Sequence, residues 1–159
     1  MTVRAYNDDS EALWRFKKEF EQELGAGGST EKAETYAEKL TPEYRERYVE
    51  WVERCLSVDP ECIQLAVVDD EPVGYIFVLP ETHAMIWDAG VINELYLAPE
   101  HRGTGLADAL LEAGLAVIES QSLPLSRVIL DVSPENERAQ AVYERHGFTP
   151  WAELVVREL

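Results

Sequence analysis

The sequence predicts a single α/β domain, a layered sandwich of strands and helices. Short runs rich in β-branched and aromatic residues alternate along the chain with longer segments of helical periodicity. No internal repeat or low-complexity tract interrupts that alternation. At 159 residues, 46% of them hydrophobic, the chain is long enough for one sizeable core and too short for two ordinary domains. We therefore expect residues 1–159 to form one domain.

The N-terminal third predicts one strand and three helices. Thr2 to Tyr6 alternates enough for an edge strand, and the polar residues that follow can cap a helix. In that helix apolar residues recur near helical spacing until the glycines at 25–28 end it. Ser29 and Thr30 can cap a second helix to about Leu40. A third helix is expected from Pro42 through Leu56, because proline at the first turn loses no hydrogen bond.

The middle of the chain predicts a hairpin and one further strand. Cys62 to Val68 and Val73 to Leu79 are strand-like runs joined by a compact turn. Pro80 to Gly90 is an irregular connection, and Val91 to Leu97 forms the next strand.

The C-terminal part predicts two helices and two strands. The helix from about Gly105 to Ser120 is apolar on more than one face, so it should be deeply packed. A β-branched strand from Val128 to Val132 precedes a helix from Asn136 to His146. A final strand is expected from about Pro150 to Arg157.

Composition and charge exclude several classes of function. The formal net charge of −17 argues against nucleic acid and against anionic membranes as partners. That charge either attracts a cationic acceptor or keeps the surface solvated, and both explanations stay open. We find no apolar run of about 18 residues and no basic-then-apolar N-terminal segment, so we expect a cytoplasmic protein without a membrane span or secretory signal.

The cysteines and histidines do not predict a metal site. Cys55 and Cys62 lack C-x-x-C spacing, and the three histidines are scattered. We interpret both cysteines as buried structural thiols.

The stretch from Asn93 to Ala107 predicts a phosphate-binding loop. An extended apolar run breaks into a turn at Gly103 and Gly105 and then into a long helix, whose N-terminus attracts anions. A strand-to-helix turn can also contain glycine for steric reasons alone. The spacing excludes a Walker loop. A dinucleotide fingerprint would place Asp108 where its third glycine belongs, so a small nicotinamide-binding domain remains a weaker alternative.

A second motif follows the Val128 to Val132 strand, and it is written Asn136-x-x-Ala139-x-x-x-Tyr143-x-x-x-Gly147-Phe148. Together with Arg102-x-x-Gly105-x-Ala107, it resembles the two main motifs of the Gcn5-related N-acetyltransferase superfamily, which uses acetyl-coenzyme A. The resemblance covers roughly Ile92 to Phe148. It implies a three-layer fold with a central mixed, partly splayed β-sheet and helices on both faces.

The resemblance also implies a coenzyme site. Backbone amides after the strand would hold the pyrophosphate, and the strand itself would pair with the pantetheine arm as a peptide adds to a sheet edge. Asp108 is discordant there, unless it points to solvent or pairs with a base. The residues implied in coenzyme binding are Leu95, Tyr96, Leu97, Arg102, Gly103, Thr104, Gly105, Leu106, Ala107, Asp108, Asn136 and Tyr143.

Three residues are predicted to act in catalysis. Tyr143 matches the tyrosine of the family that protonates the departing thiolate; its alternative is a packing role. A phenol of pKa about 10 facing a thiol of about 8.5 makes that proton transfer nearly balanced. The base that takes the proton from the acceptor amine is Glu94, Asp131 or water alone.

We therefore predict an N-acetyltransferase that moves the acetyl group of acetyl-coenzyme A to a primary amine by direct attack in a ternary complex, without a metal. The alternative is a catalytically silent acyl-coenzyme A sensor or interaction module. Trp87 and Asp88, with Trp51 and Trp151, could form an aromatic and acidic pocket for a cationic amine, although tryptophans in a small core more often pack. The acceptor, a small amine or a peptide, and a homodimer are left open.

Overall fold

In the computed structural model, which describes residues 1–159, five strands and six α-helices follow one another with two short 3-10 turns. In chain order these are β1 (Thr2–Ala5), α1 (Ser10–Ala26), α2 (Thr30–Glu38), α3 (Pro42–Val58), β2 (Ile63–Val68), β3 (Glu71–Val78), η1 (Glu81–His83), α4 (Ala84–Trp87), β4 (Gly90–Leu97), η2 (Pro99–His101), α5 (Leu106–Glu119), β5 (Val128–Ile129) and α6 (Glu137–Arg145). None of these helices is long and apolar enough to cross a membrane.

The strands form one mixed sheet in the order β1-β2-β3-β4-β5. The first four are antiparallel neighbours, whereas β4 and β5 are parallel. β4 pairs with β3 from Ile92 to Leu97, but it pairs with β5 only at Gly90 and Val91. From Ile92 onward β4 therefore has no strand partner on its β5 side, and the sheet splays open there, as the resemblance implied.

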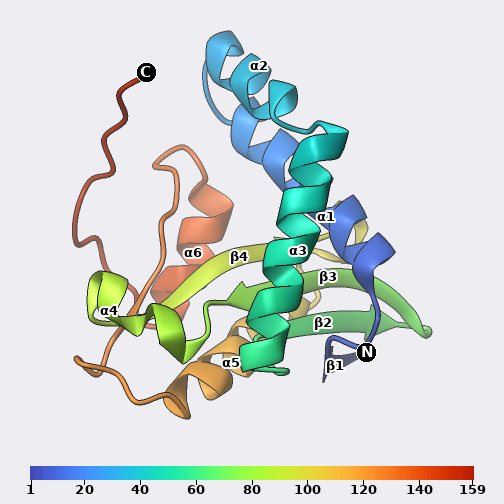
Figure 1. Cartoon of the computed structure of the whole chain (residues 1–159), viewed down its shortest axis with the longest axis vertical. Coiled ribbons are helices and arrows are strands. Elements are labelled where there is room, and N and C mark those ends of the chain that lie inside the picture. The colour runs from blue at the N-terminus through green and yellow to red at the C-terminus, as the bar shows by residue number, and fades with distance from the viewer.

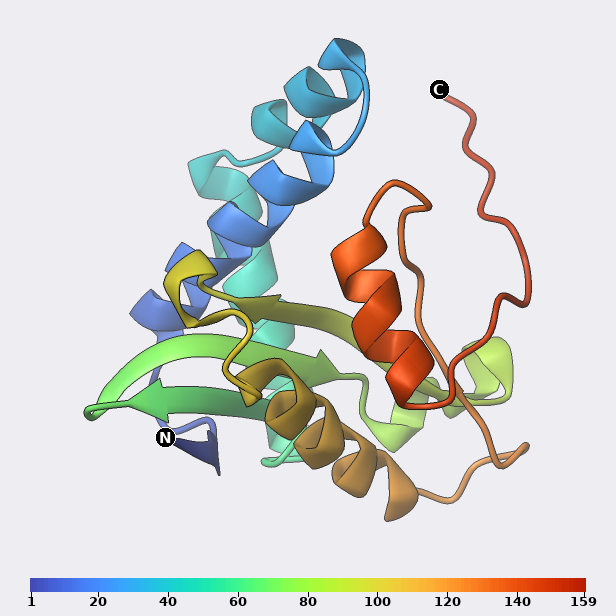
Figure 2. The same ribbon diagram turned by 180° about the vertical axis from the view of Figure 1, so that it is seen from behind.

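Helices cover both faces of this sheet. α1 and α3 lie over one face and α5 over the other, as the opposite views in Figures 1 and 2 show. α5 can approach the strands closely because Gly114 lacks a side chain; a Cβ there would lie 2.5 Å from the Ile76 Cδ1 atom. Leu110 and Leu111 on the same helix are fully buried, and each such burial stabilises the fold by about 1.5–3 kcal/mol. The deep packing expected of this helix is confirmed.

Local capping explains where several helices begin. The Ser29 hydroxyl accepts a hydrogen bond from the Lys32 amide at the start of α2, and Thr41 does the same for the Tyr44 amide at the start of α3. The Asn136 side chain accepts from the Ala139 amide at the start of α6. These starts were expected, because a cap depends on residues within one turn of each other.

The two cysteines are buried free thiols, as expected. Burial raises the pKa of the Cys62 thiol to about 12. A thiol with that pKa is inert near neutral pH.

The expected strands near the C-terminus differ from the structure. The prediction of a final strand from Pro150 to Arg157 is wrong, because the residues from Pro150 to Leu159 are exposed and form no strand. A β-branched run forms a strand only where a neighbouring strand accepts its hydrogen bonds, and none pairs with this run. β5 ends at Ile129 instead of Val132, because its pairing with β4 stops where the sheet splays.

Candidate functional site

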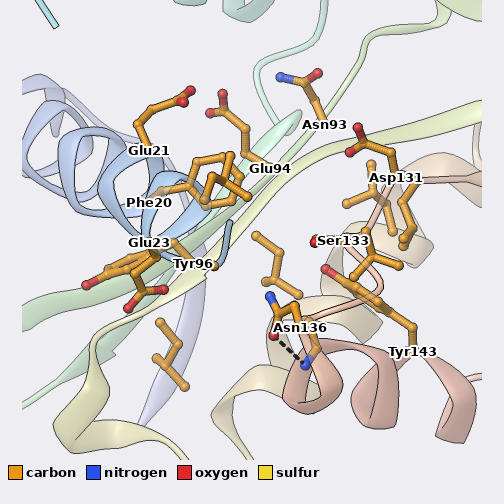
Figure 3. A pocket seen from close by; sticks show the side chains of 18 of the residues that line it. Phe20, Glu21, Glu23, Asn93, Glu94, Tyr96, Asp131, Ser133, Asn136 and Tyr143 are labelled. Atoms are coloured by element: carbon orange, nitrogen blue, oxygen red, sulfur yellow. Dashed lines mark hydrogen bonds between the residues drawn. The ribbon is translucent and has the colours of Figure 1, made fainter. Parts of the chain in front are cut away.

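A cavity of about 1940 Å³ opens where the sheet splays, between β4 and α6, and it extends along α1, α2 and α3. Sites for one small ligand usually have volumes of about 300–1,000 Å³, so this cavity can hold two substrates. Figure 3 shows side chains from α1, β4, α6 and the segment after β5 projecting into it.

The glycine loop forms one end of the cavity. Gly103 and Gly105 both line it, and both have positive φ angles, 76° and 88°. Nothing lies within 4 Å of where a Cβ would be at either position. Glycine is therefore required here by backbone conformation and not by crowding, and the space in front of the loop is open.

The backbone amides of residues 103–108 donate to no other group in the protein. The side chain of Thr104 steadies the loop by donating to the His101 carbonyl oxygen, 2.5 Å away. Six free N–H groups at the N-terminus of a 14-residue helix form an anion site, because the helix dipole adds a partial positive charge to them.

Asp108 lies in the first turn of this helix, but its charge is compensated. Its carboxylate accepts from Arg145 at 2.9 Å and contacts His146 Nε2 at 2.9 Å. Those contacts, with His146 the stronger, lower the pKa of Asp108. The discordant residue thus pairs with two bases at the C-terminal end of α6 and leaves the loop amides free.

Arg102 stands at the entrance to the loop and is held by two acceptors. Its Nε donates to the Leu97 carbonyl at 2.8 Å, and its terminal nitrogen lies 2.5 Å from the Glu23 carboxylate on α1. Arg138 on α6 approaches the same carboxylate at 3.7 Å. Glu23 therefore holds two arginines at the edge of the cavity.

Glu94 lies on the β4 wall, and its carboxylate is fully engaged. It accepts hydrogen bonds from Lys17 Nζ at 2.5 Å, from the Tyr48 hydroxyl at 2.6 Å and from the Tyr75 hydroxyl at 3.0 Å. Lys17 also pairs with Glu21 at 2.5 Å. All five side chains of this group, which we call the Glu94 cluster, are buried.

The electrostatics of the Glu94 cluster fix the protonation states of its side chains. Burial lowers the pKa of Lys17, but the charges of Glu94 and Glu21 outweigh it and raise that pKa above 10.5. Burial, reinforced by Glu94, also raises the pKa values of Tyr48 and Tyr75 well above 10. Lys17 therefore stays protonated and both tyrosines stay neutral donors to Glu94.

The opposite wall carries Tyr143, Asp131 and Asn136. Tyr143 reaches from α6 into the cavity, towards the β4 wall (Figure 3). Its hydroxyl has no hydrogen-bond partner in the protein, and its ring packs edge-on against Phe148 at 5.8 Å. Burial and the nearby charge of Asp131 raise the pKa of Tyr143 to about 12. Asp131 itself is exposed and lines the same cavity.

Comparison with known proteins identifies the family. Residues 28–148 match the family model described as the acetyltransferase (GNAT) family. The chain belongs to this family.

Two curated relatives agree with that assignment. The mycothiol acetyltransferase of Thermobispora bispora is 46% identical over 65 residues, which cover 39% of this chain and 21% of the relative. The N-alpha-acetyltransferase 30 of Schizosaccharomyces pombe is 30% identical over 95 residues, which cover 60% of this chain and 62% of the relative. The matched region thus spans less than two thirds of either relative.

Solved structures share the fold along nearly the whole chain. A GCN5-related N-acetyltransferase from Ralstonia eutropha JMP134 superposes with a TM-score of 0.71 at 20% identity, covering 99% of this chain and 97% of that one. PaiA N-acetyltransferase from Thermoplasma acidophilum, solved in complex with coenzyme A, gives a TM-score of 0.69 at 22% identity, covering 94% and 91%.

Basic residues are concentrated at the cavity of this GNAT chain, where they meet a similar number of acidic residues. Eight of its 14 lysines and arginines line the cavity, namely Lys17, Lys32, Lys39, Arg47, Arg54, Arg102, Arg138 and Arg145. Nine acidic residues line it as well, so the cavity is close to electrical balance within a chain of net charge −17.

Two residues predicted to contact the acceptor do not reach the GNAT cavity. Trp87 and Asp88 lie on and just after α4, both exposed, and neither lines it. Trp151 is 82% exposed and lies against Arg127. Trp51 does line the cavity, where its ring packs 5.0 Å from the ring of Phe77.

The sequence analysis missed the partners of Glu94. Lys17 and Glu21 are four residues apart on α1, a spacing that indicates an ion pair but not whether it is buried. Tyr48 and Tyr75 carry no local signal, because they approach Glu94 only through packing of α3 and β3 on β4.

Proposed function

We propose that this chain is an acetyl-coenzyme A-dependent N-acetyltransferase that acetylates a primary amine of a small molecule or peptide by direct attack in a ternary complex. The observation that carries the proposal is the row of free amides at 103–108, next to an open cavity with room for a second substrate. The names of the relatives, mycothiol acetyltransferase and N-alpha-acetyltransferase, are consistent with either kind of acceptor.

The coenzyme fits the residues present. A diphosphate needs several donors at once, and the amides from Gly103 to Asp108 supply them without long side chains. Arg102 stands beside them and can exchange Glu23 for phosphate. The unpaired edge of β4, from Leu95 to Leu97, offers backbone groups to an extended amide-containing arm, as a sheet edge does to a peptide.

The proposed chemistry uses Tyr143 as the general acid. Bound acetyl-coenzyme A supplies a thioester carbonyl carbon to which the amine nitrogen bonds as the carbon–sulfur bond breaks. The Tyr143 hydroxyl gives its proton to the departing sulfur. Because the pKa of Tyr143 is about 12, the phenol is protonated at every working pH, and solvent restores its proton after each turnover.

Asp131 or water is the better-placed base. The acceptor ammonium must lose a proton before its nitrogen can attack. Three donors already occupy the Glu94 carboxylate, whereas Asp131 accepts no hydrogen bond from the protein and faces the cavity. We therefore propose that Asp131 takes the proton, directly or through water, and that Glu94 organises the β4 wall.

Calorimetric titration with acetyl-coenzyme A tests the proposal. We expect a dissociation constant in the micromolar range; binding weaker than millimolar would count heavily against it. Free-thiol release across small amines, amino sugars, polyamines and peptide N-termini then tests turnover. Binding without thiol release from any acceptor would favour the silent sensor. Tighter binding of a reduced nicotinamide dinucleotide would favour the dinucleotide-binding alternative.

A further inference from the structure

One face of α3 presents two arginines to the cavity without a partner. Arg47, Trp51 and Arg54 are spaced i, i+4 and i+7, so they share one side of the helix, and all three line the cavity. The two arginines are about 10 Å apart along the helix axis, with the indole between them.

This face lies beside the splayed part of β4. Trp51 packs on Phe77, which is the register partner of Glu94 across β3 and β4. Tyr48, three residues before Trp51 on α3, donates a hydrogen bond to the Glu94 carboxylate. Figure 1 shows α3 lying across the strands of the sheet. The arginines therefore flank the part of the cavity next to Glu94 and away from the glycine loop.

Two of the carboxylates at this end are paired with lysines. Glu94 and Glu21 pair with Lys17, and Glu21 also pairs with Lys39 at 2.7 Å. Glu50 lies on the same face of α3, but it forms no ion pair with either arginine. Arg47 and Arg54 set against Glu50 leave one net positive charge on this face of α3.

Five of the ten arginines in this acidic chain have a carboxylate partner. Arg45, on the same helix, pairs with Glu11 at 2.6 Å. Arg4, Arg102 and Arg145 are likewise paired with carboxylates. Arg15, Arg127 and Arg157 also form no ion pair with a carboxylate, but they lie outside the cavity, so Arg47 and Arg54 are the two unpaired arginines that an anionic group entering the cavity would meet.

We propose that the acceptor amine also carries an oxyanion, a carboxylate or a phosphate, which Arg47 and Arg54 bind while the amine points towards β4 and Tyr143. The guanidinium group suits this role because its planar fork donates two parallel hydrogen bonds to one oxyanion. The inference rests on the proposed N-acetyltransferase function and names its acceptor class. It differs from the cationic acceptor that the net charge alone suggested.

Matched pairs of amines test the proposal. Phenylalanine is compared with phenylalaninamide, and O-phosphoethanolamine with ethanolamine, by free-thiol release from acetyl-coenzyme A. The wild type should prefer at least one oxyanion-bearing member by about 10- to 100-fold in kcat/KM, the range expected for hydrogen bonds to a charged group. Whichever pair shows the larger preference distinguishes carboxylate from phosphate.

The variants Arg47→Ala, Arg54→Ala and their double variant should remove that preference, mainly through KM. The neutral member of each pair should be unaffected. Arg45→Ala is the control, because it removes an arginine from the same helix outside the cavity. A wild-type preference for the neutral members, or an equal loss for both members in the double variant, would overturn the proposal.

Direct binding separates this proposal from the proposed function. If acetyl-coenzyme A fails to bind or no thiol is released, ligand-observed NMR compares the same amine pairs on wild type and double variant without coenzyme. Saturation transfer to the oxyanion members that is lost in the double variant supports the anion site even then. Equal transfer to both members of each pair refutes it.

Discussion

On one wall of the cavity Glu94 is 4% exposed and holds three donors, whereas on the opposite wall Asp131 is exposed and accepts no hydrogen bond from the protein. The tyrosines differ in the same way. The hydroxyls of Tyr48 and Tyr75 donate hydrogen bonds to Glu94, whereas the Tyr143 hydroxyl has no hydrogen-bond partner in the protein. Carboxylates and tyrosines therefore form a hydrogen-bonded wall on one side of the cavity and remain free to react on the other.

The difference teaches that residue type alone does not assign a catalytic role. A buried carboxylate that is satisfied by an ammonium and two phenols stabilises the fold, and using it as a base would break the network. A carboxylate at the edge of an open cavity can gain and lose a proton without that disruption. Substitutions on the wall with the Glu94 cluster should therefore lower stability, whereas substitutions on the wall with Tyr143 and Asp131 should lower activity.

The largest effect on activity is expected on the wall that carries Tyr143 and Asp131. Tyr143→Phe removes the proposed acid, so kcat should fall by about 10²- to 10⁴-fold, while affinity for acetyl-coenzyme A changes little. Steady-state kinetics and calorimetry measure the two quantities. Because the pKa of Tyr143 is about 12, wild-type activity should show no loss from this group up to about pH 10. An unchanged kcat in the variant would remove Tyr143 from the acid role.

On the wall that carries the Glu94 cluster, substitutions should chiefly lower the stability of the fold. Lys17→Ala leaves Glu21 and Glu94 buried without their shared cation, so the free energy of unfolding should fall by about 3–5 kcal/mol. Glu94 and Glu21 raise the pKa of Lys17 above 10.5, so its contribution is present at neutral pH and is lost only as the pH rises through that higher value. Urea denaturation measures the change.

The control for this wall is Lys18→Ala. Lys18 is the next residue on α1 and is exposed, so its removal should change stability by no more than about 0.5 kcal/mol. Equal effects of the two alanine variants would mean that the Glu94 cluster adds nothing to the fold.

Substitution of Asp131 and of Glu94 compares the two walls directly, with smaller expected effects. Asp131→Asn should lower kcat/KM by about 10²-fold at neutral pH with little loss of stability, because bulk water can replace an exposed base in part. Glu94→Gln should chiefly lower the urea midpoint. If activity responds to Glu94→Gln in a variant that is still fully folded and not to Asp131→Asn, the assignment of the base is reversed.

The smallest effect is expected at the contact between α5 and α6. Asp108→Asn should destabilise the protein by about 0.2–1 kcal/mol, since the ion pair with Arg145 is partly exposed. His146 and Arg145 lower the pKa of Asp108 below 3.8, so this contribution is present above that pH and is lost as the pH falls through the lowered value. Thermal unfolding between neutral pH and pH 3 checks the trend, and a difference that grows on acidification would contradict it.

Much of the fold was readable from the sequence because it depends on neighbours along the chain. Caps at Ser29, Thr41 and Asn136 act within one turn, and the glycine loop joins a strand directly to the helix that it begins. The expected strand at 150–157 was the exception, since a strand needs a partner that local propensity does not supply. The loop amides and Tyr143 were likewise readable, because both belong to spaced motifs.

The sequence by itself determined the alternation of strands and helices, the helix caps and the family motifs, all of which depend on residues close together in the chain. Only the tertiary structure decided the state of the side chains around them. Lys17 meets Glu94 across 77 positions, and Asp108 meets His146 across 38. Burial and charge at such pairs depend on how α1, α3 and α6 pack against the sheet, and no local pattern encodes that packing.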